Sequence, residues 1–139
     1  MTKIYLEWLE KAEGDYHTAL RDYRARKFPN YDSACFHAQQ CIEKYFKGYF
    51  QKQRVYFPKT HDLNALLDML LSSQPSWEVF RNDLKMLSVY AIEVRYPGES
   101  ATRQQAGEAI RVMQRIRDKF RVLLNLEAAN SSVRSRAGK

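Results

Sequence analysis

The clearest hydrophobic pattern in the chain runs from Tyr31 to Phe50. Apolar residues there recur at the three- and four-residue steps of one helical face, which predicts a helix from about Asn30 to about Gln53. The opposite face carries a row of polar residues: Asp32, Ser33, Gln39, Gln40, Glu43, Lys44 and Lys47. The pattern therefore predicts one buried helix with an ordered polar row, which is either a binding surface or a solvated face.

Four further segments show the helical period, over about 3–27, 60–71, 76–96 and 102–127. Thr60 is the expected N-cap of the short third helix, and Thr102 with Gln105 fits a capping box before the last one. No stretch of useful length alternates with the two-residue period of a strand. We therefore predict an all-α fold, an up-and-down antiparallel helical bundle of four long helices plus one short helix.

A chain of 139 residues is most simply one domain, which we place at residues 1–127. Residues 128–139 are small, polar and basic, and we expect a flexible tail there. The formal net charge is +7, of which the tail contributes three through Arg134, Arg136 and Lys139. The body is mildly basic, which permits attraction to phosphates without requiring it.

Both cysteines, Cys35 and Cys41, lie on the apolar face of the second predicted helix. Six residues apart on a helix they cannot close a disulfide without distortion, so we expect buried thiols in a reducing compartment. Charged residues interrupt the N-terminus where a secretory leader would be apolar, and no apolar run approaches the roughly 20 residues of a membrane span. The expected location is the cytoplasm, with no membrane contact.

Several kinds of chemistry have no sequence signature here. Glycine-rich phosphate loops and paired metal-binding motifs are absent, so no metal site is expected. Of the three histidines, His17 fits an exposed position, and His37 is either a hydrogen-bonding residue at the bundle edge or part of a polar site. His61 lies at a helix start, where it either fixes the loop or faces an anion.

Four segments occur in an order and spacing that resembles the HEPN domain, the "higher eukaryotes and prokaryotes nucleotide-binding" family. They are WLEKAEGDYHTAL, YDSACFHAQQCIEKYFKGYF, KTHDL and VRYPGE, and the resemblance spans Tyr5 to Leu124. It implies a helical bundle that commonly forms homodimers. Many members pair with a minimal nucleotidyltransferase, in several cases as toxin and antitoxin, and other branches are metal-independent ribonucleases with an Arg-x(4–6)-His motif at a dimer cleft.

Our first hypothesis is a non-catalytic binding module that pairs with such a nucleotidyltransferase and holds RNA or a nucleotide such as ATP, with no other cofactor. Eight residues are the expected ligand-binding groups: His37, Gln40, Lys44 and Lys47 along one helical edge, with Lys59, His61, Arg95 and Tyr96 from loop regions. The alternative for these residues is structural, with solvated lysines, an arginine that caps helix carbonyls and a packed tyrosine.

A second hypothesis is a metal-independent endoribonuclease. Arg54 and His61 match the Arg-x(4–6)-His motif by count, and would supply phosphate stabilisation and proton transfer. They fall, however, at the end of one predicted helix and the start of the next, with Pro58 between them. In the ribonuclease branches the motif lies later in the chain, where Arg95 has no histidine within reach. We therefore favour the non-catalytic alternative.

A third hypothesis is a structural, dimeric adaptor bundle. The nine tyrosines and seven phenylalanines exceed what one small core needs, so some aromatic side chains would line an interface. The expected interface residues lie near the end of the second helix: Tyr45, Tyr49, Phe50, Tyr56 and Phe57.

Overall fold

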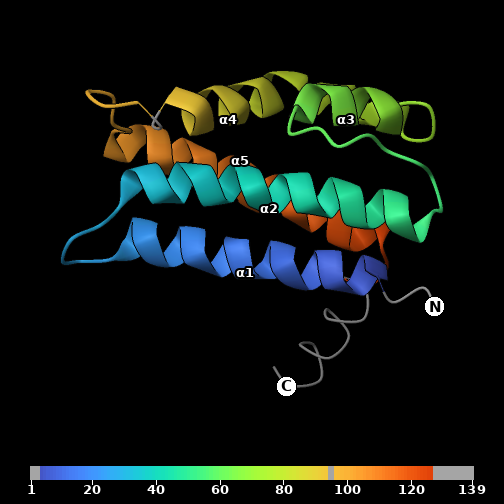
Figure 1. Ribbon diagram of the computed structural model, residues 1–139, viewed down its shortest axis with the longest axis horizontal. Helices are drawn as coiled ribbons and strands as arrows, with labels where there is room; N and C mark the ends of the chain where they lie inside the picture. The colour runs from blue at the N-terminus through green and yellow to red at the C-terminus, as the bar shows by residue number, and fades with distance from the viewer. Residues whose placement is uncertain (1–3, 94–95, 127–139) are drawn as a thin grey trace.

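The computed structural model describes residues 4–93 and 96–126, and every regular element in that part of the chain is helical (Figure 1). The elements are α1 (Ile4–Arg24), α2 (Tyr31–Lys52), α3 (Leu63–Leu70), a 3₁₀ helix η1 (Pro75–Phe80), α4 (Arg81–Glu93) and α5 (Arg103–Leu123). The predicted all-α bundle of four long helices and one short helix is confirmed. The predicted tail at 128–139 lies outside the described residues.

The helices form an up-and-down arrangement in which α2 is central. In Figure 1, α1 and α2 run antiparallel, α5 lies behind α2, and α3 and α4 lie along the opposite side of α2 from α1. Helix α2 contacts each of the four other α-helices. The third pass of the bundle is divided, because α3 runs in one direction and η1 with α4 returns in the other.

The central position of α2 changes the interpretation of its polar row. Gln39, Glu43 and Lys47 are buried, although the helical period assigns them to the polar face. The row therefore does not form one solvated edge, and that part of the prediction is wrong. A helix that is covered on several sides has too few exposed positions for all its polar residues, so the buried ones must find partners within the protein.

Of the two predicted helix caps, one is confirmed. The side chain of Asn30 accepts a hydrogen bond from the amide of Ser33 at 2.9 Å, and the capping box of Thr102 and Gln105 is present. The predicted N-cap of α3 is wrong by two residues. Asp62 caps that helix by accepting from the amides of Asn64 and Ala65, while Thr60 Oγ1 accepts from the amide of Asp62.

The fourth helix also differs from its prediction at its start. It begins as the 3₁₀ turn η1, with Pro75 at its first position, and becomes α-helical only at Arg81. Proline fixes its own φ and has no amide hydrogen, so it suits the first turn of a helix. The described part of α4 ends at Glu93.

Helices α1 and α2 approach closely at Gly48. A Cβ atom on Gly48 would lie 2.9 Å from Leu9 Cδ2 and 3.1 Å from Trp8 Cβ, so α1 occupies the space that a side chain would need. The glycine in α1, Gly14, has no such neighbour within 4 Å. The two glycines therefore have different roles, because only Gly48 is required by packing.

The aromatic residues are used mainly inside the bundle. Phe120 of α5 packs against Tyr45, Phe46 and Trp77, with ring centroids 4.7 to 5.7 Å apart. The expectation that Tyr45, Tyr49 and Phe50 line a partner interface is wrong, because the central helix buries all three. Phe57 packs on the rings of Trp8 and Phe50, whereas Tyr56 is 86% exposed.

Both cysteines are free and buried, as the apolar stripe predicts. Burial, followed by the negative charge of Asp32, raises the pKa of Cys35 to about 12. Burial raises the pKa of Cys41 as well. No helix in the described part of the chain is long and apolar enough to span a membrane.

Candidate functional site

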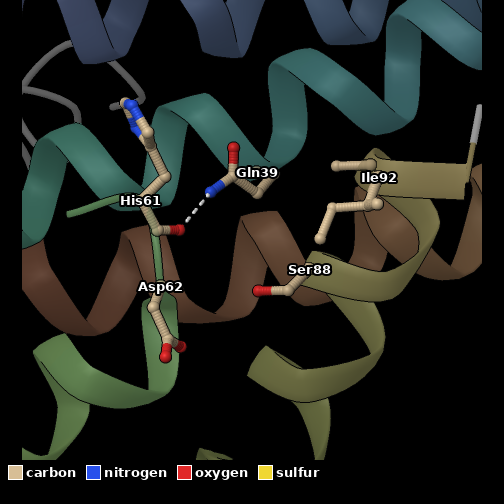
Figure 2. Close-up of a pocket in the computed structure, with 6 residues that line it drawn as sticks. Gln39, His61, Asp62, Ser88 and Ile92 are labelled. Carbon is tan, nitrogen blue, oxygen red and sulfur yellow. Dashed lines mark hydrogen bonds between the residues drawn. The ribbon is translucent and has the colours of Figure 1, made fainter. Parts of the chain in front are cut away.

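A pocket of about 460 Å³ lies between α2, the start of α3 and the C-terminal half of α4 (Figure 2). We call it the α2–α4 pocket. Its lining combines polar side chains with two apolar ones, and consists of Gln39, His61, Asp62, Ser88, Ala91 and Ile92. A mixture of a few fixed polar groups with apolar surface is typical of sites for small organic ligands.

The connection between α2 and α3 positions His61 in this pocket. After α2 ends, the chain turns back along the bundle, and the side chain of Gln39 donates a hydrogen bond to the carbonyl of His61 at 3.2 Å (Figure 2). Asp62 then caps α3. Since both neighbouring segments are held by hydrogen bonds, the His61 backbone is fixed while its side chain remains 80% exposed.

A buried carboxylate organises the polar groups behind the pocket. Glu43 Oε2 lies 2.9 Å from Lys47 Nζ and 2.9 Å from His61 Nδ1, while Oε1 accepts from Gln39 Nε2 at 3.1 Å. A carboxylate oxygen accepts hydrogen bonds, so Glu43 Oε2 is an acceptor both for the Lys47 ammonium and for an N–H at His61 Nδ1. The other ring nitrogen of His61, Nε2, takes no part in this contact.

Ser88 contributes an unusual polar atom to the pocket wall. Its Oγ is inaccessible to solvent and has no hydrogen-bond partner within the described residues. In Figure 2 this oxygen points toward the side of the pocket where His61 and Asp62 lie. A buried hydroxyl without a partner is costly, and a bound molecule would relieve that cost once a small shift of the pocket wall uncovers the oxygen.

Two other polar residues of α2, His37 and Lys44, face α1 instead of the pocket. Lys44 Nζ lies 2.5 Å from Asp15 Oδ2, and His37 Nε2 lies 3.9 Å from Asp15 Oδ1. His37 Nδ1 is 2.9 Å from the carbonyl oxygen and 3.1 Å from Oγ of Ser33. These contacts form a polar seam between α1 and α2, and they occupy the groups that a ligand would otherwise use.

A family model for the HEPN domain matches residues 5–123 of the chain. The chain belongs to the HEPN family. A search of curated proteins and a search of solved structures gave no significant match. The family supports a module whose work concerns nucleotides or RNA, and the helical bundle implied by the resemblance is the one observed.

The residues expected to bind a ligand in this HEPN domain are not all brought together. His61 lines the α2–α4 pocket, and Gln40 donates a hydrogen bond at 2.8 Å to Oε1 of Gln39, which also lines it. His37 and Lys44 lie on the α1 seam, and Lys47 is buried against Glu43. Lys59 and Tyr96 are exposed, and Arg95 lies outside the described residues.

The two residues that match the ribonuclease motif by count are separated in this HEPN domain. Arg54 follows α2 directly, with a positive φ of 59°, whereas His61 lies beside Glu43, near the middle of α2. From Glu43, α2 continues for nine residues to its end at Lys52, a rise of about 13.5 Å, and Arg54 lies beyond that end. The guanidinium of Arg54 and the imidazole of His61 therefore do not form a shared site within one chain.

Three polar residues of the pocket were missing from the sequence hypothesis: Gln39, Asp62 and Ser88. Gln39 has a weak signal in the sequence, since it stands on the polar face beside Gln40. Ser88 has no signal at all, because a serine among the apolar residues of α4 is ordinary. Only the packing of α4 near α2 gives it a place in the pocket.

An arginine-rich cluster joins α1, α2 and α5 away from the α2–α4 pocket. Arg117 donates two hydrogen bonds of 2.7 Å to Glu13, and its guanidinium lies 3.9 Å from the ring centre of Tyr16. Tyr45 also donates to Glu13, and Arg121 donates to the Tyr45 hydroxyl at 3.3 Å. Burial by itself would raise the pKa of Glu13, but these hydrogen bonds and the two arginine charges outweigh it and lower that pKa.

The described residues contain no cluster of three histidine, cysteine, aspartate or glutamate side chains that could hold a metal ion. The Glu13 cluster has one carboxylate for two guanidinium groups. Arg117 donates to Glu13 itself, and Arg121 donates to the hydroxyl of Tyr45. It is therefore a cross-link between helices. The α2–α4 pocket, by contrast, combines polar groups with room for a ligand.

Proposed function

We propose that this HEPN domain is a non-catalytic binding module that holds a nucleotide such as ATP, or an RNA nucleotide, in the α2–α4 pocket. The observation that carries the proposal is the pocket itself, which sets the Ser88 hydroxyl opposite the Gln39–His61 pair. Its volume of about 460 Å³ falls within the range of small-molecule sites. Ala91 and Ile92 supply an apolar wall for a base, and the polar groups supply hydrogen bonds to its edge.

The phosphates of such a ligand would extend toward solvent. The His61 ring is exposed beside the pocket and points away from Ser88 in Figure 2, and Lys59 is exposed two residues earlier. Lysine and histidine are suitable phosphate contacts. Lys44 is a weaker candidate than the sequence suggested, because Asp15 already neutralises it.

Isothermal titration with ATP, GTP and UTP tests this proposal. We expect saturable binding that falls by about tenfold or more in Ser88→Ala and in His61→Ala, since each removes one hydrogen bond to the ligand. His17→Ala is the matched control, because His17 is a similarly exposed histidine on α1 outside the pocket. No binding of any nucleotide would refute the pocket assignment.

We further propose that the module pairs with a minimal nucleotidyltransferase in a toxin–antitoxin-like system and forms a homodimer. This part rests on the family, whose members commonly pair in this way. Co-expression with the product of the adjacent reading frame, followed by multi-angle light scattering, is the test. A monomer that co-elutes with no nucleotidyltransferase would contradict it.

A metal-independent endoribonuclease is the second candidate, and one contact favours it. Glu43 orients His61 and leaves its Nε2 atom able to accept a proton, which is the arrangement of a general base. The arginine would have to come from Arg95 or from a second copy, because Arg54 is remote. Cleavage of a labelled RNA in EDTA, lost in His61→Ala and kept in His17→Ala, would support this alternative over the non-catalytic one.

A further inference from the structure

One end of the bundle carries a second pocket of about 460 Å³, formed where α1 ends, α2 begins and α5 begins. We call it the arginine pocket, and its principal residues are Tyr23, Arg24, Arg26, Pro29, Tyr31 and Arg103. Figure 1 shows the α1–α2 loop and the start of α5 at the same end of the molecule. The pocket has no residue in common with the α2–α4 pocket.

The arginines of this pocket are free to bind a ligand. Arg24, Arg26 and Arg103 make no ion pair or side-chain hydrogen bond within the described residues. Other arginines of the domain behave differently, since Arg81 and Arg115 are paired with carboxylates at 2.6 to 2.9 Å. Three unpaired guanidinium groups around one cavity create a positive potential that attracts anions.

The acidic residues at this end are held by other groups. Asp22 Oδ2 accepts from Ser33 Oγ at 2.5 Å, and Asp32 Oδ1 accepts from the amide of Ala101 at 2.6 Å. Asp22 also meets Arg21, at 3.5 Å. These carboxylates therefore fasten the helix ends together and leave the three pocket arginines without a carboxylate partner.

The positive surface continues beyond the pocket. A Cβ atom on Gly107 would lie 2.9 Å from the Tyr23 hydroxyl and 3.4 Å from Arg111 Nη1, so Arg111 adjoins the pocket through Tyr23. Lys27 is exposed in the α1–α2 loop, next to Arg26. The three pocket arginines, Arg111 and Lys27 together carry five positive charges. This is more than one phosphate group would neutralise, so the surface suits a polyanion.

An exposed aromatic ring lies in the same loop. Phe28 is 93% exposed, and its φ of 55° places it in the left-handed region, which is uncommon for a large residue. A phenylalanine ring that is almost wholly in water contributes nothing to the core. Beside cationic side chains it has the composition of surfaces on which unpaired bases stack while the backbone phosphates meet arginines.

We propose that the arginine pocket and Phe28 form a binding site for single-stranded nucleic acid. Arg24, Arg26 and Arg103 contact successive phosphates, and the ring of Phe28 stacks on a base. An acidic protein segment could pair with the arginines, but its carboxylates would make no contact that requires the exposed ring of Phe28. This site would serve the RNA-related role of the domain, and it therefore rests on that part of the proposed function. It does not depend on nucleotide binding in the α2–α4 pocket.

Fluorescence anisotropy with a labelled 12-nucleotide oligouridine, measured on the full chain from 50 to 200 mM KCl, tests the site. The variants are Arg24→Gln/Arg26→Gln/Arg103→Gln and Phe28→Ala. The matched control is Lys11→Gln/Lys85→Gln/Lys119→Gln, which removes the same charge from exposed positions outside the pocket. Circular dichroism melting confirms that each variant is folded, and oligothymidine compares DNA with RNA.

We expect the triple arginine variant to lose at least about tenfold in affinity and to reduce the slope of log K against log salt by about 2, at about 0.7 per phosphate contact. Phe28→Ala should lose about tenfold, as for one stacked base. Equal losses in the arginine and lysine variants, or full competition by polyglutamate, would overturn the site. Wild-type protein that binds ATP but no oligonucleotide would refute this inference alone.

Discussion

Lys47 Nζ and Glu43 Oε2 lie 2.9 Å apart, one turn of α2 from each other, with side chains only 8% and 4% exposed. The pair is also in contact with its surroundings, because Lys47 Nζ lies 5.8 Å from the ring centre of Trp8 and Glu43 accepts from Gln39. This buried ion pair supports the polar side of the α2–α4 pocket through His61.

Removing one member of this pair should destabilise the domain strongly. Lys47→Met leaves Glu43 buried without its cation, for which we expect a loss of about 3–5 kcal/mol in the free energy of unfolding. Lys47→Met/Glu43→Leu should lose less than Lys47→Met, because no unpaired charge remains. Urea unfolding measures both, with the exposed Lys11→Met as control. A double variant less stable than either single one would contradict the argument.

The Glu13 cluster predicts a dependence of stability on pH. Because the pKa of Glu13 is lowered in the folded protein, its contribution is full above its ordinary pKa of 4.5 and is lost as pH falls through the lowered value. Glu13→Gln should therefore reduce the melting temperature at pH 7, and the difference from wild type should shrink as pH falls below about 4.5. Glu10→Gln, on an exposed position of α1, should show no such convergence.

Gly48 and Gly14 predict opposite effects of substitution by alanine. Gly48→Ala forces a methyl group against Leu9 and Trp8, and we expect a loss of about 1–3 kcal/mol from overpacking. Gly14→Ala meets nothing within 4 Å and should stabilise the domain by up to about 1 kcal/mol through helix propensity. Thermal unfolding of the two variants side by side decides the matter, and a stabilised Gly48→Ala would show that α1 can move away.

The cysteines should be inert in the folded protein. With a pKa of about 12, Cys35 is a thiolate in only about one molecule in ten thousand at pH 8. Cys41 is fully buried and has its pKa raised as well. Labelling with iodoacetamide at pH 8, read by mass spectrometry, should give almost no adduct without urea and two adducts in urea. Rapid labelling of the native protein would mean that α2 opens locally.

The hydrophobic period was sufficient to predict most of the architecture. Each long helix has an apolar face wide enough to define its length, and asparagine or threonine with glutamine marks the start of α2 and α5. The N-cap of α3 was misplaced because Thr60 and Asp62 are both good capping residues and lie two positions apart. Local sequence alone does not decide between two such residues, whereas the route of the chain does.

The site was less predictable for a different reason. Helical periodicity separates polar from apolar positions but does not say how many neighbours a helix has, so the burial of Glu43 and Lys47 was not foreseen. The meeting of Gln39 with His61 depends on a connection that turns back along α2, and no periodic pattern encodes that route. The arginine pocket likewise depends on three chain segments converging at one end.

The divided third pass of the bundle has a consequence for how the domain opens. Helix α3 has only eight residues, and its contacts are with α2, α4 and η1. It can therefore detach at a lower free energy than the whole bundle unfolds, while α1, α2 and α5 stay together. Amide hydrogens of α3 would then exchange in a faster class than those of α2. Each such opening would remove the His61–Asp62 wall of the α2–α4 pocket, so a ligand held there would slow that exchange.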